Sequence, residues 1–216
     1  MLLTVGLLLR VLAFGTQVVP THSLSFDFTA DVEQCASFTI SFAGPSLGSM
    51  PSFLSMIPVN STAISVPLPY PFEVSAGIAL SFLPFPAGAN FVASLDNSTG
   101  ESLILVSDFK RVLPSSINNS SCLNVDVARC FTINTTVSQC EDFKINYNTS
   151  VVTRAPIVRL YSPKGPSFLL NSTSDNATAG TATYTMSFER GRQLILLMED
   201  GGMIRETSPL MTGSYF

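Results

Sequence analysis

Hydrophobic and polar residues alternate along several short stretches of the chain. Phe38, Ile40 and Phe42 are separated by Thr39 and Ser41. Successive side chains of a strand point to opposite faces, so each such stretch turns its apolar set to a core and its polar set to water. The same period of two recurs within residues 143–147 and 183–188, and residues 91–95 and 194–198 are predicted as further strands. Sustained helical periodicity is missing beyond the N-terminal segment, so the sequence predicts an all-β fold.

Turn-forming residues separate these stretches, at 86–88, 96–97, 162–165 and 200–202. Short strands joined by frequent turns are typical of Ig-like or fibronectin-like β-sandwiches. Antibody-type domains carry a core Trp, and this chain has none. The sequence therefore predicts the general sandwich, with Phe42 and Tyr147 as candidates to replace the core aromatic residue.

The chain contains an internal repeat. Residues 26–42 match residues 131–147 at an offset of 105, and residues 88–96 match 191–199 after a two-residue adjustment. Repetition at about a hundred residues indicates tandem domains and not a solenoid. We expect a signal peptide at 1–23, a first sandwich domain at 24–112, a linker at 113–129 and a second sandwich domain at 130–216.

The first residues resemble a secretory signal, although Arg10 interrupts the apolar run. Thr21 and Ser23 offer small side chains at −3 and −1 for cleavage before Leu24. The alternative is a buried N-terminal strand or helix. We expect export to the cell surface or beyond.

Charged residues make up only 12% of the chain, against about a quarter in ordinary soluble domains. Hydroxyl groups or attached sugar would have to keep such a surface soluble. Because Asn118 and Asn119 overlap, we expect only one of them to carry a glycan; the alternative is a polar surface without glycans. The Asn-x-Ser/Thr sequons stand at Asn60, Asn97, Asn118, Asn119, Asn134, Asn148, Asn171 and Asn176.

Four cysteines in an exported chain suggest two disulfides. We favour Cys35 with Cys122, which would span the first domain. Cys130 with Cys140 would then close a short local loop. A Cys-x-x-Cys pair is missing, so a zinc ribbon or a thioredoxin-type site lacks its spacing.

Charge and hydropathy narrow the set of partners. The net charge is −4 and the eleven Lys and Arg are scattered, which argues against nucleic acid, since phosphate binding needs concentrated basic residues. A second apolar run of about 20 residues is missing, so we expect no membrane span in the mature chain. The C-terminal residues also lack the apolar tail of a lipid-anchor signal.

A further pattern resembles a class of fungal, basidiomycete-type surface proteins. The pattern is Gln34-Cys35 followed by Phe38, Ile40 and Phe42, with further matches at residues 44, 51, 53–59, 86–91, 96–100 and 119–123. These proteins are similar to the Ser/Thr-rich, lipid-anchored cell-wall domain of yeast β-1,6-glucan assembly. The resemblance implies fold and surface location more than activity, because its motifs are structural.

The chain departs from that family in three ways. Members usually have Trp where Phe42 stands and a Gly-Gly-x-Pro-Pro turn where residues 44–51 stand. They also usually continue into another cysteine, a Ser/Thr-rich stalk and a membrane helix or anchor. The resemblance thus implies a truncated or released form, and a downstream cysteine as another candidate partner for Cys140.

Catalytic machinery is sparse in the sequence. The single histidine, His22, precedes the expected cleavage site, which removes imidazole-based nucleophilic sites and histidine-ligated zinc from the mature chain. Glu141 with Asp142, and Glu199 with Asp200, are neighbours that a strand would point to opposite faces, so they would not converge on one glycosidic bond. We expect solvated carboxylates there and no cofactor.

A calcium site at Asp96, Asn97 and Ser98 lacks the spaced oxygen ligands of a known loop. We therefore interpret these residues as turn residues and expect no metal.

Three functions remain in view. The first is a non-catalytic structural or adhesive surface module, with cell-wall polysaccharide or surface proteins as partners. The second is a secreted carbohydrate-binding module that uses Tyr70 and Phe72, which prolines flank, although these rings could instead pack on their own domain. The third is a glycoside hydrolase built on the carboxylates named above.

Overall fold

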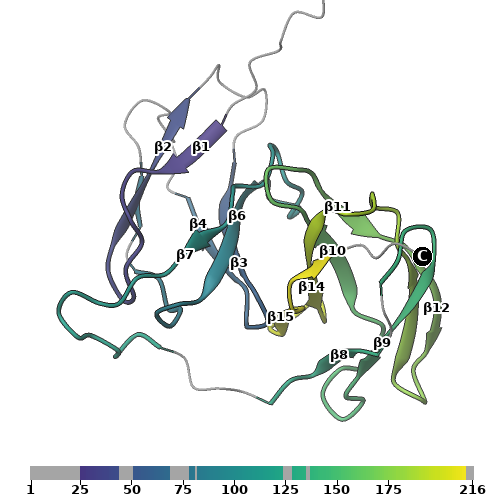
Figure 1. The fold of residues 1–216 in the computed structure, drawn as a ribbon. Coiled ribbons are helices and arrows are strands. Elements are labelled where there is room, and N and C mark those ends of the chain that lie inside the picture. Colours follow the sequence, from purple (N-terminus) through teal and green to yellow (C-terminus); the bar gives the residue numbers. More distant parts are fainter. Residues whose placement is uncertain are drawn as a thin grey trace, which may run out of the picture.

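A computed structural model describes residues 25–43, 51–68, 78–80, 82–123, 128–134 and 137–212. The described residues form strands and no helix, which confirms the predicted all-β fold (Figure 1). The signal peptide predicted at 1–23 lies outside them. The strands are β1 (Ser25–Phe28), β2 (Phe38–Ala43), β3 (Phe53–Pro58), β4 (Ile64–Pro67), β5 (Ile78–Leu80), β6 (Asn90–Asp96), β7 (Lys110–Arg111), β8 (Phe131–Ile133), β9 (Asp142–Tyr147), β10 (Ile157–Tyr161), β11 (Ser167–Leu170), β12 (Ser172–Asn176), β13 (Thr181–Thr185), β14 (Gln193–Glu199), β15 (Arg205–Thr207) and β16 (Met211–Thr212).

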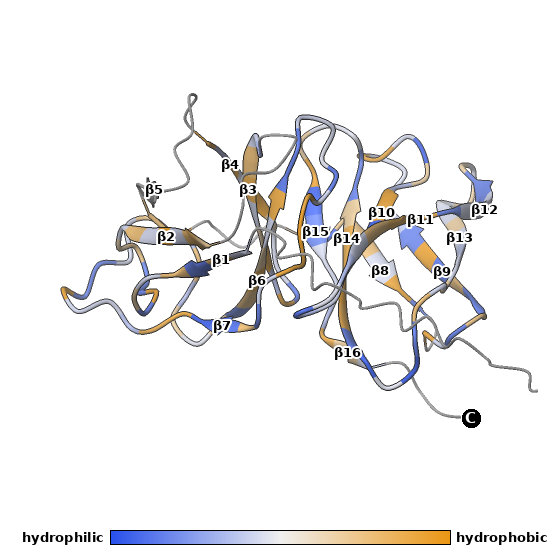
Figure 2. Cartoon of the chain, turned by 90° about the horizontal axis from the view of Figure 1, so that it is seen from above, coloured by the Kyte–Doolittle hydropathy of each residue, from blue (hydrophilic) through white to orange (hydrophobic). Residues whose placement is uncertain are grey.

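The strands form four antiparallel sheets, numbered here I to IV. Sheet I has the order β1-β2-β5 and sheet II the order β4-β3-β6-β7. Sheet III has the order β11-β10-β14-β15, with β16 also paired to β14, and sheet IV the order β12-β13-β9-β8. Figure 2 shows the sheets side by side in the order I to IV. Sheets I and II belong to the first half of the chain (25–123), and sheets III and IV to the second half (128–212).

Each half encloses its own apolar core, as a β-sandwich requires. The first core lies between sheets I and II and contains Phe28, Ile40, Met56 and Phe91. The second lies between sheets III and IV and contains Phe143, Leu160, Tyr184 and Leu196. Alternation places these side chains inward, as the sequence pattern predicts.

A third core joins sheets II and III. It is formed by Ile57, Ala63, Val92 and Val106 of the first half and Tyr161, Ile195 and Leu197 of the second half. All these side chains are at most 4% exposed. Strands β6 and β14 are thus buried on both faces, because alternate side chains enter different cores. Figure 2 shows the hydrophobic colour concentrated on these central strands.

The two halves repeat the same local structure. Cys35 and Cys140 have positive φ values of 57° and 61°. The Cys35 backbone N donates to the Leu83 carbonyl, and the Cys140 backbone N donates to the Met186 carbonyl. Beyond these loops, β2 and β9 each pair with the short strand that precedes them, β1 and β8. The sequence repeat therefore corresponds to a structural repeat.

Part of the stretch predicted as a linker contacts the first half closely. The Leu113 backbone N donates to the Val32 carbonyl, and Gln34 Nε2 donates to the Asn119 carbonyl. Cys122 forms a disulfide with Cys35, as predicted. Residues 113–123 are thereby fixed on the first half.

Candidate functional site

The boundary between the halves carries the polar groups that are most deeply buried in the described residues. At one end of this boundary, residues 60–63 run antiparallel to residues 205–208. The Asn60 N donates to the Ser208 carbonyl, and the Ala63 N donates to the Arg205 carbonyl. Thr62 and Glu206 form a β-bridge between them. This short ladder joins the turn after β3 to β15 by backbone hydrogen bonds.

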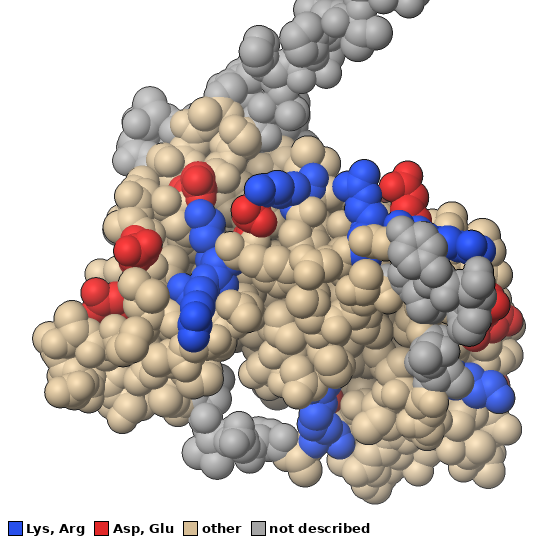
Figure 3. Space-filling view, in the orientation of Figure 1, with Lys and Arg blue, Asp and Glu red and all other residues tan. Residues whose placement is uncertain are grey.

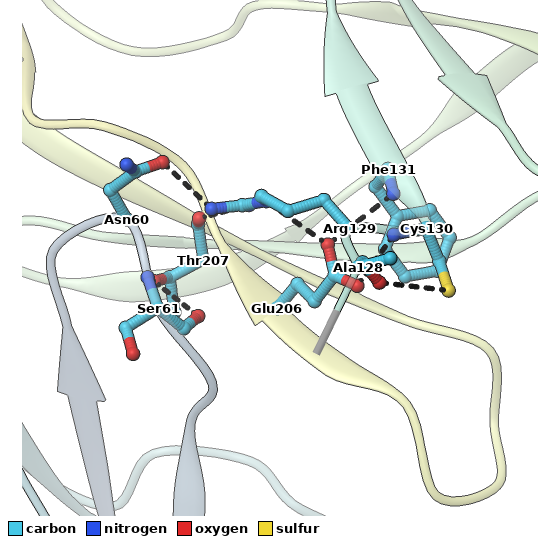
Figure 4. A network of polar contacts seen from close by, with 8 residues as sticks. All are labelled: Asn60, Ser61, Ala128, Arg129, Cys130, Phe131, Glu206 and Thr207. Carbon is cyan, nitrogen blue, oxygen red and sulfur yellow. Dashed lines mark hydrogen bonds and ion pairs between the residues drawn. The ribbon is translucent and has the colours of Figure 1, made fainter. Parts of the chain in front are cut away.

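Side chains reinforce the ladder (Figure 4). Arg129 donates from Nη1 to Asn60 Oδ1 at 2.7 Å and from Nη2 to the Thr207 carbonyl at 2.6 Å. Its Nε forms an ion pair with Glu206 Oε2 at 3.2 Å. Glu206 also accepts the Cys130 N–H at 2.7 Å, so its two oxygens satisfy the beginning of β8. Because one carboxylate serves several donors, this contact fixes the entry of the chain into the second half.

At another part of the same boundary, a pocket of about 390 Å³ opens between sheets II and III. Its charged lining consists of Asp96 from β6, Arg159 from β10, Glu199 from β14 and Arg205 from β15. Asp96 and Arg159 are only 3% and 7% exposed. Tyr161 also lines it. Buried charges are costly unless they are paired, so each of these four side chains is expected to have a partner.

Three of the four charges have close partners. Arg205 Nε pairs with Glu199 Oε1, and Arg205 Nη1 donates to Ser65 Oγ. Asp96 Oδ1 accepts the Ser94 hydroxyl at 2.6 Å. Burial raises the pKa of Asp96 above its ordinary value, and hydrogen bonds from Ser55 and Ser94 oppose this only in part. Arg159 has no hydrogen bond or ion pair with another described residue.

The Tyr161 phenol next to these charges is almost fully buried. Desolvation by burial raises its pKa, and the nearby Asp96 carboxylate raises it further, whereas Arg159 lowers it. The phenol thus stays a neutral, polar part of the pocket wall at neutral pH.

Sequence reasoning did not bring these pocket residues together. Asp96 appeared in the sequence as a turn residue beside Asn97 and Ser98. In the structure it is the last residue of β6 and is buried. Arg159 is the residue from which the sequence could have indicated the pocket. A charged side chain at the centre of the strand Ile157–Tyr161 needs either a charged partner or a solvent-filled pocket.

The other carboxylates proposed as acid–base candidates have structural contacts. Asp142 accepts the Thr185 hydroxyl. Asp200 accepts the backbone N–H groups of Gly202 and Ile204 and so closes the turn after β14. Glu141 is exposed. Of these four candidates only Glu199 lines the pocket, and its sequence neighbour Asp200 does not.

The second predicted disulfide is not formed: Cys130 and Cys140 are free thiols. The pairing of β8 with β9 explains the separation. Cys130 precedes β8 and its carbonyl accepts the Asn148 N–H at one end of the ladder, whereas Cys140 precedes β9 at the other end. The six residues of β9 span roughly 20 Å at the usual rise per residue, far beyond the reach of a disulfide.

All eight sequon asparagines are accessible to some degree. Asn97 and Asn119 are half-buried and the other six are exposed. In three sequons the hydroxyl of the third residue donates to the side-chain oxygen of the asparagine, in the pairs Thr99–Asn97, Ser121–Asn119 and Ser150–Asn148. Tyr70 and Phe72, proposed as glycan contacts, lie outside the described residues.

Several other kinds of site are not seen in the part of the chain that is described. These residues contain no group of His, Cys, Asp and Glu side chains arranged to hold a metal ion. None of their segments is a helix that is long and apolar enough to cross a membrane. On the face drawn in Figure 3, the acidic and basic side chains form small groups, and most acidic side chains lie near a basic one.

Comparison of the sequence with models of known protein families gives no match, and neither does a search of curated proteins. The function is therefore argued from the chain itself.

Proposed function

We propose that this chain is a non-catalytic structural or adhesive module that works outside the cell or at its surface. The observation that supports this best is the third core. Sheets II and III bury apolar side chains against each other, and the ladder of residues 60–63 with 205–208 closes one end. A rigid body of this kind suits the display of loops and glycans more than it suits turnover, which commonly requires a moving lid or loop.

Export and glycosylation belong to the same proposal. The predicted N-terminal signal and the eight accessible sequons support it, and so does the resemblance to fungal surface proteins. A chain with so few charges would gain solubility from glycans.

The test is expression of the full chain in a secreting eukaryotic host. We expect a protein in the medium that begins at Leu24 and loses several glycan masses on treatment with an N-glycosidase. The number of disulfides follows from the difference in intact mass between protein alkylated after reduction and protein alkylated without reduction. Retention inside the cell without glycans would refute the proposal.

Adhesion is tested separately with beads coated with the secreted protein. We expect them to bind isolated cell walls or cells more than beads coated with unfolded, reduced protein. Equal binding by the two bead types would remove the adhesive role.

A secreted carbohydrate-binding module is the second candidate, and the pocket between sheets II and III favours it. The pocket combines hydroxyl groups, charges and an aromatic side chain, which is the mixture that a sugar needs. Retention on insoluble glucan or chitin in a pull-down would support this candidate. Lack of retention would remove these two polymers as ligands. Release of reducing sugar, abolished by Ala at Glu141, Asp142, Glu199 and Asp200, would instead indicate a hydrolase.

A further inference from the structure

Among the described residues, Arg159 is the one Lys or Arg that is buried. Arg159 stands in the middle of β10, whose Val158 and Leu160 enter the second core. By alternation Arg159 lies on the opposite face, with Tyr161, toward sheet II. The residue is 7% exposed, and its side chain has neither a hydrogen bond nor an ion pair with another described residue. A guanidinium has five donors, and the Arg159 nitrogens are not among the fully buried side-chain atoms that lack a partner, so these donors are open to the pocket and to an acceptor that enters it.

The pocket that Arg159 lines has the size and the walls of a small-molecule site. Its volume of about 390 Å³ is at the lower end of the usual range for such sites. Hydroxyl groups come from Ser55, Ser65 and Ser98, and apolar surface from Phe53, Ile157 and Leu169. Both halves of the chain contribute, so the pocket exists only when sheets II and III are packed together.

The charges in the pocket indicate which ligand would fit. Glu199 and Arg205 neutralise each other, which leaves Asp96 and Arg159. No ion pair joins Asp96 to Arg159, although the charge of Arg159 acts to lower the pKa of Asp96. Asp96 Oδ1 already accepts the Ser94 hydroxyl. One singly charged carboxylate could pair with Arg159 through two parallel hydrogen bonds. A doubly charged phosphate would bring a second negative charge beside Asp96 that Arg159 alone does not offset.

We propose that this pocket binds a sugar acid. The carboxylate of the ligand pairs with Arg159, and its hydroxyl groups exchange hydrogen bonds with the serine hydroxyls and the carboxylates of the wall. The ligand is either a free sugar acid or one residue of an acidic polysaccharide. This site goes beyond the proposed surface role and does not depend on it, because binding is measured on the purified chain wherever the protein acts.

The test is isothermal titration calorimetry of the purified full chain with glucuronate, glucose, inorganic phosphate and a glucuronate-containing trisaccharide. We expect glucuronate to bind at least about tenfold more tightly than glucose or phosphate, because only it offers one carboxylate together with hydroxyl groups. Tighter binding of the trisaccharide than of glucuronate would identify the polysaccharide as the source. Equal or weaker binding of the trisaccharide would identify the free acid.

Two variants connect the binding to the pocket. Arg159→Gln should weaken glucuronate binding at least about tenfold, because it removes the charge-assisted pair. Ser98→Trp should do the same by filling the pocket from an exposed wall position, with little risk to the fold and with the Asn97 sequon kept. The matched control is Arg192→Gln, which removes an exposed arginine that pairs with Glu189. It should bind as the wild type does.

The proposal is overturned if glucuronate fails to bind, or if it binds no more tightly than glucose or phosphate. It is also overturned if Ser98→Trp, shown to be folded by thermal unfolding, binds glucuronate as tightly as the wild type. Failure of secretion or of adhesion would leave this result unaffected, so the two proposals fail separately.

Discussion

Cys35 and Cys140 occupy equivalent positions in the two halves and share a left-handed backbone conformation, yet only Cys35 is in a disulfide. A positive φ is uncommon for a residue other than glycine, so its presence at both cysteines marks the repeat in the backbone itself. Cys140 is exposed, whereas Cys130 is half-buried beside Glu206.

The first prediction concerns these two thiols. Burial and the nearby Glu206 carboxylate raise the pKa of Cys130, so less of it is thiolate at neutral pH. We expect a maleimide reagent to modify Cys140 rapidly and Cys130 slowly in the native protein, as followed by intact mass and peptide mapping. In denaturant the two rates should become similar. Complete protection of both until reduction would show a disulfide between them.

The second prediction concerns the third core. Leu197→Ala should lower the free energy of unfolding by about 2–5 kcal/mol, the usual cost of a large cavity. Hydrogen exchange should also speed up in β3 and β6 of the first half, because Leu197 packs in the same core as Ile57 and Val92. Leu169→Ala, at a position 49% exposed, is the control and should change stability by no more than about 0.5 kcal/mol. If Leu197→Ala speeds up hydrogen exchange only in the second half, the halves do not stabilise each other.

The third prediction concerns Glu206 (Figure 4). Glu206→Ala leaves the N–H groups of Cys130 and Phe131 and the Nε of Arg129 without their acceptor. We expect a loss of about 2 kcal/mol in urea unfolding, below the value for a fully buried pair because Arg129 is partly exposed. Glu101→Ala, which removes an exposed contact with Asn97, should have little effect. Equal stability of the two variants would contradict the structural role of Glu206.

The fourth prediction concerns pH. Because burial raises the pKa of Asp96, folding favours its protonated form. The contribution of Asp96 to stability is therefore fully present below its ordinary pKa of 3.8 and declines as the pH rises through the higher folded-state value. We expect the free energy of unfolding of the wild type, minus that of Asp96→Asn, to fall with rising pH in this window. A difference that rises with pH would mean that the folded state favours the carboxylate.

The strands could be predicted because alternation is a local property. Phe143, Ile145 and Tyr147 are buried as the period of two requires, and the disulfide between Cys35 and Cys122 is the pairing that we favoured. In contrast, the contact of sheet II with sheet III depends on residues distant in sequence. The apolar run at 194–198 could have indicated this contact, since a strand without polar residues is expected to be buried on both faces.

The pocket was beyond sequence reasoning for a related reason. Asp96 and Arg159 belong to different halves, and nothing local links a carboxylate at the end of one strand to an arginine in the middle of another. The thiols show the same limit, since Cys130 and Cys140 are only ten residues apart but lie at opposite ends of a strand ladder.

The burial of β6 and β14 on both faces also has a consequence for how this sequence can diverge. Within each strand, neighbouring positions such as Val92 and Ala93 face different cores, so hardly any position there is free to vary in size or polarity. Substitutions should accumulate instead on β12, whose five residues are all exposed. Saturation mutagenesis would therefore find the most tolerant of the described strands at the outer edge and the two least tolerant at the centre.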